Sequence, residues 1–159
     1  MEKFKSVSNE LTAAVLEWEK KLLELPENTY TNRKNSQNRS IKQILGHMCD
    51  SASNNTHRII HLQYQPSPLV FPDYANLGNN DRWIAIQNYQ QENWHDLVKL
   101  WRYLNLHFAH IIMNVKEEKL KNTWTTAKGD VVTLEEMVLD FPHHFNLHLK
   151  EISDLINNS

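Results

Sequence analysis

Two histidines four residues apart are the residues in this chain best placed to do chemistry. On a helix, His144 and His148 would share one face, about 5–6 Å apart at Cβ. This spacing allows two imidazoles to bind one metal ion. The apolar residues around them form one stripe at about 100° per residue, with His148 near its middle and His144 on its flank. The stripe consists of Leu134, Met137, Val138, Phe141, Phe145, Ile152 and Leu155.

A structural role competes with this interpretation. A histidine on an apolar helix face is more often a hydrogen-bonded core residue than a metal ligand. Two in register must each find polar partners in a dry interior, which is harder to satisfy. The pair alone therefore leaves the core and metal interpretations evenly balanced. His143 points to the opposite side, and we expect it to be solvated.

A metal site of this kind needs a third protein ligand, and a catalytic site keeps one position open. His47 lies at the border of the apolar face of its own helix, from which it can reach a neighbouring helix. His107 lies on the flank of another apolar seam and could line the same cavity. His57 and His61 are also four residues apart, but they face away from the core of their helix. A solvated or dimer-facing role is therefore favoured for that pair.

Candidates for proton transfer are weaker. Asp50 and His107 are the candidate catalytic residues, with Asp81 and Glu92 as further acid–base or supporting groups. Asp50 could equally be a solvated helix residue. Arg58 could steady an anionic substrate, although an exposed surface arginine is the commoner case. Cys49 is expected to be a small packing residue.

Hydrophobic periodicity predicts the elements that position these residues. Apolar residues recur at spacings of three and four, which is typical of amphipathic helices packed in a bundle. Ser40 with Gln43, and Thr133 with Glu136, have the form of capping boxes. We predict helices over residues 3–25, 40–62, 93–115 and 133–156.

The connections between these helices are uneven. Residues 27–39 are predicted to form a polar loop, and residues 63–92 a long, proline-rich connection in which Asp81 begins a short helix. Residues 124–133 are predicted to form a small hairpin. Pro142 interrupts the last helix, where we expect a kink or a fresh helix start.

Composition narrows the class of protein. The 159 residues, 1–159, suit a single domain, and the formal net charge is −2. No basic stripe suggests nucleic acid, and no apolar run approaches the roughly 18 residues of a membrane span. A single cysteine excludes an internal disulfide. Together with an N-terminus that lacks an apolar signal core, this predicts a cytoplasmic protein.

The motifs together resemble the DinB-like superfamily. The similar segments are Ile44-Leu-Gly-His-Met-Cys-Asp50, the seam Leu97–His107, the entry to the last helix at Thr133, and His144-x-x-x-His148. The resemblance covers nearly the whole chain. It implies an all-α, up-down-down-up four-helix bundle, often a homodimer, with a metal held by His47, His144 and His148.

Three functions follow as hypotheses. The first is a metal-dependent hydrolase that activates a bound water toward a small-molecule substrate. The second is a metal-dependent transferase or isomerase that uses a low-molecular-weight thiol of the bacillithiol, mycothiol or glutathione type. The third is a non-catalytic, metal-binding dimeric bundle. Three neutral imidazoles suit a divalent transition metal, zinc or nickel first and then iron or manganese.

Overall fold

A computed structural model describes residues 2–158 of the chain, and over these residues the fold is a helical bundle with a small antiparallel sheet. Four long helices match the predicted ones within a few residues at their ends. Shorter helices lie in the connections between them. The elements are α1 (Glu2–Leu23), α2 (Glu27–Asn32), α3 (Ile41–Tyr64), α4 (Asn79–Gln87), η1 (Tyr89–Gln91), α5 (Trp94–Ile112), η2 (Glu117–Lys119), β1 (Thr123–Thr125), β2 (Val131–Thr133) and α6 (Leu134–Asn157).

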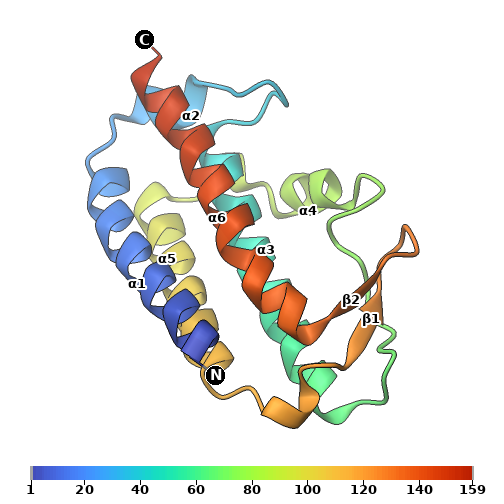
Figure 1. Cartoon of the computed structure of the whole chain (residues 1–159). Coiled ribbons are helices and arrows are strands. Elements are labelled where there is room, and N and C mark those ends of the chain that lie inside the picture. Colours follow the sequence, from blue (N-terminus) through green and yellow to red (C-terminus); the bar gives the residue numbers. More distant parts are fainter. Residues whose placement is uncertain (1, 159) are drawn as a thin grey trace.

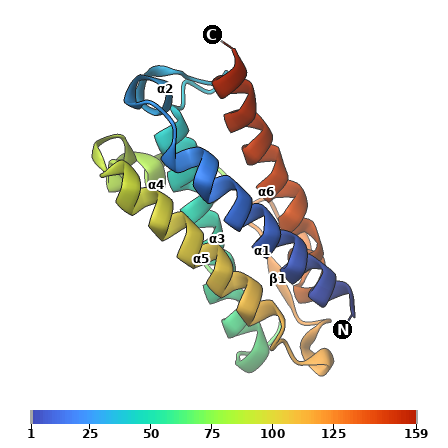
Figure 2. The same ribbon diagram turned by 90° about the vertical axis from the view of Figure 1, so that its left-hand side faces the viewer.

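The long helices run up, down, down and up. Figure 1 shows α1 rising from the N-terminus, α3 and α5 descending, and α6 rising again to the C-terminus. Figure 2 shows the same directions from the side, with α1 and α5 together in front of α3. This confirms the predicted bundle, in which the parallel pair α3 and α5 requires a long connection from the lower end of α3 back to the upper end of α5 (Figure 1).

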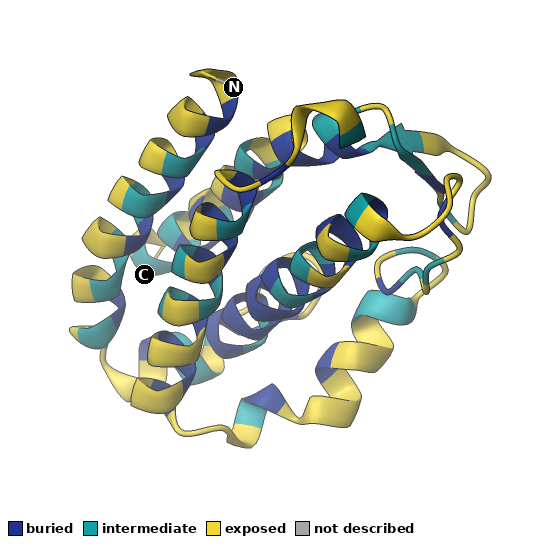
Figure 3. Cartoon of the chain, turned by 90° about the horizontal axis from the view of Figure 1, so that it is seen from below, coloured by how far each residue is buried: buried dark blue, intermediate teal, exposed yellow. Residues whose placement is uncertain are grey.

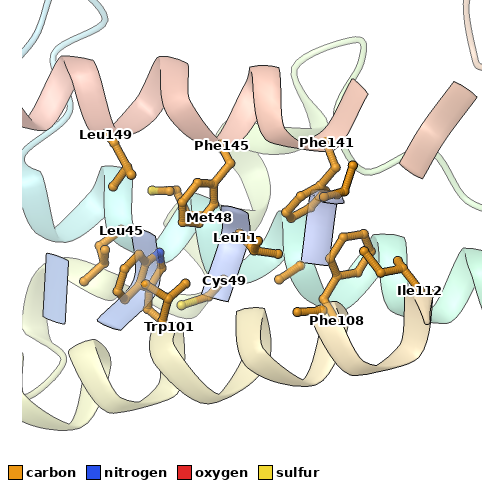
Figure 4. Packing of buried hydrophobic residues seen from close by; sticks show 14 of the residues in the cluster. Leu11, Leu45, Met48, Cys49, Trp101, Phe108, Ile112, Phe141, Phe145 and Leu149 are labelled. Atoms are coloured by element: carbon orange, nitrogen blue, oxygen red, sulfur yellow. The ribbon is translucent and has the colours of Figure 1, made fainter. Parts of the chain in front are cut away.

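Apolar stripes hold the bundle together because each helix buries one face and leaves the other in water. Figure 3 shows this division along α1, α3, α5 and α6. In the core, the Trp101 ring stacks on Phe145 at 5.9 Å and Phe108 packs on Phe141 at 4.0 Å between centroids. Cys49 is buried among these residues (Figure 4), as expected of a packing residue.

Both predicted capping boxes are present. The Ser40 hydroxyl accepts from the Gln43 backbone at the start of α3, and Thr133 and Glu136 make the reciprocal pair at the start of α6. Pro142 lies inside α6, which is one helix from Leu134 to Asn157 and does not begin afresh there. The caps set where α3 and α6 begin.

The connections contain more regular structure than predicted. Residues 27–39 begin with the short helix α2, and residues 63–92 contain α4 and η1 as well as open loop. The short helix expected near Asp81 is confirmed as α4. Short polar helices of this kind have little apolar periodicity, and tertiary contacts decide them.

The predicted hairpin is present as β1 and β2, with Trp124 paired to Val132. A bridge between Leu69 and Trp124 ties the long connection to this hairpin. The sheet therefore stands beside the start of α6 (Figure 1). Its Trp124 ring contacts Arg58 of α3. No helix over residues 2–158 has the length and apolar character that crossing a bilayer requires.

Candidate metal centre

Three histidines from two helices meet inside the bundle. One ligand nitrogen each from His47 on α3 and from His144 and His148 on α6 lie within 4.8 Å of one another. The ring centroids of His47 and His148 are 4.7 Å apart, and those of His144 and His148 are 4.4 Å apart. These are the three residues that the family resemblance implied as metal ligands, and the structure brings them together.

The hydrogen bonds of the cluster leave ring nitrogens directed at one another. His148 Nδ1 lies 2.8 Å from a carboxylate oxygen of Glu151, which accepts its proton. In a neutral ring with its proton on Nδ1, the other nitrogen, Nε2, is an acceptor, and it lies 3.0 Å from His144 Nε2, which then donates to it. A carboxylate behind a histidine is the usual arrangement that orients a metal-ligating imidazole.

Burial keeps two of these imidazoles neutral. It lowers the pKa of His47 to about 2, with the neighbouring His148 and His144 adding to the effect. It also lowers the pKa of His144 to about 4, again with His148 contributing. Neutral imidazole is the form that binds metal, so both groups are ready to do so at pH 7.

The residues present fit a metal ion. His47 Nδ1 is buried and has no hydrogen-bond partner among the described residues. An unsatisfied buried ring nitrogen is costly, and a cation shared with two further imidazoles would satisfy it. The donor set is three nitrogens, which suits zinc, nickel or another borderline divalent ion.

A cleft of about 700 Å³ opens beside the cluster. It runs between α3, the hairpin and the first half of α6, and His144 forms part of its wall. Its volume is within the range of small-molecule sites. The other lining residues are Ser51, Asn55, Arg58, Tyr74, Ala75, Trp124, Val131, Val132, Glu136, Met137, Leu139, Asp140 and Phe141.

Arg58 is not the exposed arginine that the sequence favoured. Its side chain is 4 % exposed, and its guanidinium carbon lies 3.7 Å from the centroid of the Trp124 ring. The sequence favoured exposure because arginine is seldom buried, and it could not show that the hairpin folds over this part of α3. Tyr74 was missed for a similar reason, because the long connection carries it to within 6.3 Å of the His47 ring.

Asp50 is buried rather than solvated. One carboxylate oxygen accepts from the Tyr89 hydroxyl at 2.6 Å and from the Gln87 amide at 2.7 Å. Burial raises the pKa of Asp50, while these two hydrogen bonds oppose the rise. The carboxylate joins α3 to α4 and η1, and it is not part of the cleft lining.

The remaining histidines lie apart from the cluster. His107 is exposed on α5 and stacks on His110, so the structure does not bring it to the cleft. His143 is exposed, as expected from helix phase. His57 is also exposed, and His61 Nδ1 pairs with the Tyr64 hydroxyl at 2.8 Å.

Comparisons with known proteins identify the fold. No known family profile matches the sequence, and no curated protein matches it. Among solved structures, the chain is similar to YfiT from Bacillus subtilis, described as a probable metal-dependent hydrolase with an unusual four-helix bundle topology. The TM-score is 0.78 over 97 % of this chain and 84 % of that chain, at 15 % identity. The chain therefore has the fold that its resemblance to the DinB-like superfamily implied, a helical bundle like that of YfiT.

Proposed function

We propose that this protein is a metal-dependent hydrolase of small molecules, with His47, His144 and His148 as the metal ligands. One observation carries the proposal, namely three mutually facing imidazoles of which one, His144, also lines the cleft. Three protein ligands leave coordination positions for water and substrate, whereas structural zinc sites usually close all four with protein. The description of YfiT as a probable hydrolase supports the same reading.

When bound, a divalent ion supplies Lewis acidity, which brings the pKa of a coordinated water close to neutrality. The residues of the chain hold and orient the reacting groups. Glu151 accepts the Nδ1 proton of His148 and so directs the Nε2 lone pair toward the other two histidines. Val131, Val132 and Phe141 give the cleft an apolar wall against which a substrate can pack.

The residue that accepts a proton in the reaction should be one that lines the cleft. Asp140 lies one helical turn before His144, lines the cleft and is exposed, so its carboxylate can accept a proton there. Neither Asp50 nor His107 lines the cleft, and we assign neither of them a role in proton transfer.

Replacing Asp140 by Asn is expected to lower kcat by the roughly 10²–10⁴-fold that a general base contributes, and to leave metal content unchanged.

Metal analysis tests the site. Protein purified without a nickel column is expected to contain about one ion per chain. The variants His47→Ala, His144→Ala and His148→Ala should lose most of it, because each removes one of three ligands. His143→Ala, an exposed neighbour on the same helix, is the matched control and should retain it. Equal metal content in all four variants would contradict the site.

Turnover assays separate the candidate reactions. A panel of carboxylic esters and amides tests hydrolysis, and electrophiles mixed with glutathione, bacillithiol or mycothiol test thiol transfer. The size of the cleft keeps the second candidate open, since about 700 Å³ can hold a thiol beside another small molecule. Turnover that occurs only in the presence of the thiol would contradict hydrolysis and support thiol transfer. Metal binding with no turnover in either panel would favour a non-catalytic bundle.

A further inference from the structure

An unpaired cation lies in the wall of the cleft. Arg58 is 4 % exposed, yet its Nε and Nη2 atoms have no hydrogen-bond partner within residues 2–158. Its third nitrogen makes one long contact of 3.5 Å, to the Asn55 side-chain oxygen. A buried charge that lacks partners is costly to keep, so a fold that retains one implies a partner outside the chain.

Stacking on Trp124 does not remove this need. The Trp124 ring lies 3.7 Å from the guanidinium carbon, but an aromatic ring accepts no in-plane hydrogen bond from the N–H groups at the edge of an arginine. The indole Nε1 of Trp124 is a second buried donor without a partner in the described chain. Both residues line the cleft, so this part of its wall offers several N–H donors and requires an acceptor.

The carboxylate of Asp73 is already engaged. Asp73 acts on Arg58 through space, but its two oxygens accept hydrogen bonds from the backbone of Ala75, Asn76 and Ala127 and from the Asn76 side chain. These bonds hold the long connection against the hairpin. Asp73 is therefore committed to the loop, and none of its recorded hydrogen bonds goes to the Arg58 guanidinium.

The other charged groups that line the cleft are exposed to solvent, whereas Arg58 is buried. Glu136 and Asp140 stand on the α6 side and are exposed, so water and salt screen them. Glu136 also accepts from the Thr133 backbone and hydroxyl in its capping box. Arg58 is the one buried charge among the lining residues, and it decides the charge that a bound molecule must carry there.

The place of Arg58 on α3 relates it to the metal centre. Eleven residues separate it from His47, a rotation only about 20° beyond three full turns, so the two share a helix face. The rise between them is about 16 Å, which the arginine shortens because helical side chains lean toward the N-terminus. A molecule that contacts Arg58 and reaches the three histidines is therefore extended, and Val131 and Val132 are apolar residues of the same cleft wall.

We infer that Arg58, with the Trp124 indole, is a specificity determinant that binds the carboxylate of an extended substrate whose other end reaches the three histidines. The planar guanidinium edge matches the two oxygens of a carboxylate. The inference rests on the proposed function for the reacting end of the substrate. The anionic end is assigned from the cleft alone, and it can be tested without turnover.

The test is an NMR titration of ¹⁵N-labelled full-length protein with hexanoate and with hexanamide, its uncharged isostere. The Trp124 indole and Arg58 Nε–H signals are the readouts. Hexanoate should give saturable shifts of both signals and bind about tenfold to a hundredfold more tightly than hexanamide, the range expected for hydrogen bonds to a charged group. Equal affinity of the two, or no saturable shift, overturns the inference, and this comparison does not depend on the folding of any variant.

Variants locate the effect. Arg58→Gln should lose hexanoate affinity by a similar factor, with the Trp124 signal as the readout. Arg82→Gln, which changes an exposed arginine on α4, should bind hexanoate like the wild type. Unchanged binding by Arg58→Gln overturns the inference. Inorganic phosphate is titrated in parallel, and tighter binding of phosphate than of hexanoate at Arg58 overturns the assignment of a carboxylate.

The same titration separates this inference from the proposed function. It is repeated with excess chelator and with His144→Ala, both of which remove coordination by a metal. Hexanoate binding that persists in both and still requires Arg58 supports the anionic subsite even if no metal or hydrolysis is found. Hexanoate binding that disappears with the metal assigns the carboxylate to the three histidines and overturns the role of Arg58.

Discussion

At the scale of single residues, the cluster depends on the groups behind the three histidines as much as on the histidines themselves. Glu151 fixes which nitrogen of His148 carries the proton, through a 2.8 Å hydrogen bond to Nδ1. No carboxylate supports His47 in this way, because no hydrogen bond from its ring is recorded among residues 2–158. His148 is thus held in one tautomer and orientation, while His47 is held by packing alone.

Replacing Glu151 by Gln should therefore weaken metal binding. The neutral amide is a poorer acceptor for the Nδ1 proton, and losing such a supporting carboxylate typically costs about 10–100-fold in metal affinity. Competition with a chromogenic chelator measures the affinity. Asp154→Asn, an exposed carboxylate one turn further along α6, is the control and should match the wild type. A wild-type affinity in Glu151→Gln would exclude the proposed orientation.

The buried histidines also predict a pH dependence for protein stripped of metal. His144 has a folded pKa of about 4, below the value of about 6.5 of an unfolded chain, so the unfolded state binds more protons between these values. The free energy of unfolding is therefore highest above pH 6.5 and falls as the pH drops toward 4. For His144 the loss at pH 5 is about 2 kcal/mol.

Urea unfolding at pH 7 and pH 5 measures this loss, and His144→Gln should show less of it than the wild type. The exposed control His143→Gln should behave like the wild type. Equal pH dependence in all three proteins would mean that His144 titrates normally.

At the scale of elements, the long connection between α3 and α5 has two tasks. One part places Tyr74 over the cleft, and the other packs η1 against the start of α3. Gly46 makes the second contact possible, because a Cβ there would overlap the ring of Tyr89. The Tyr89 hydroxyl then reaches Asp50, which lies one turn along the same helix.

Gly46→Ala tests this contact. Replacing glycine by alanine inside a helix by itself raises the free energy of unfolding by about 1 kcal/mol. A net decrease in Gly46→Ala would therefore reflect the clash with Tyr89. Overpacking of this kind costs about 1–3 kcal/mol. In a Tyr89→Ala background the clash is absent, and Gly46→Ala should become stabilising. Denaturant unfolding of the four proteins in this double-mutant cycle gives the coupling. A stabilising effect already in the wild-type background would contradict the packing role.

At the scale of the whole molecule, the candidate metal centre joins two helices that are far apart in sequence. His47 comes from α3, and His144 and His148 come from α6 almost a hundred residues later. An ion bound there would link the second and last long helices of the bundle. The homodimer and the cytoplasmic location expected from the sequence stay predictions, and sedimentation of the purified protein tests the first.

Chelation should lower the thermal stability of the whole bundle. A ligand that binds only the folded state stabilises it by RT ln(1 + [L]/Kd), about 4 kcal/mol when the metal stands at a thousand times its Kd. Differential scanning calorimetry with and without EDTA measures the shift. His143→Ala should show the wild-type shift and His144→Ala almost none. A shift of the same size in His144→Ala would place the metal elsewhere in the protein.

The sequence by itself determined the four long helices of the bundle and the faces of those helices on which the three histidines lie. Amphipathic periodicity is a local property that sets which residues of a helix face inward, so the four long helices and the phases of His47, His144 and His148 could be predicted from it. The exposure of His143 followed from the same phase. The capping boxes at Ser40 and Thr133 located helix starts because they too depend on residues three apart.

Only the tertiary structure decided what surrounds the cluster. Arg58 and Asp50 lie on α3 and Tyr74 lies in the long connection, at positions where the sequence favoured exposure or gave no sign of burial. They are buried because segments distant in sequence fold over them: the hairpin over Arg58, and η1 over Asp50. Such contacts depend on the path of the connections, to which helical periodicity does not extend. The ligands of the candidate metal centre were thus visible in the sequence, whereas the cleft that would select its substrate was not.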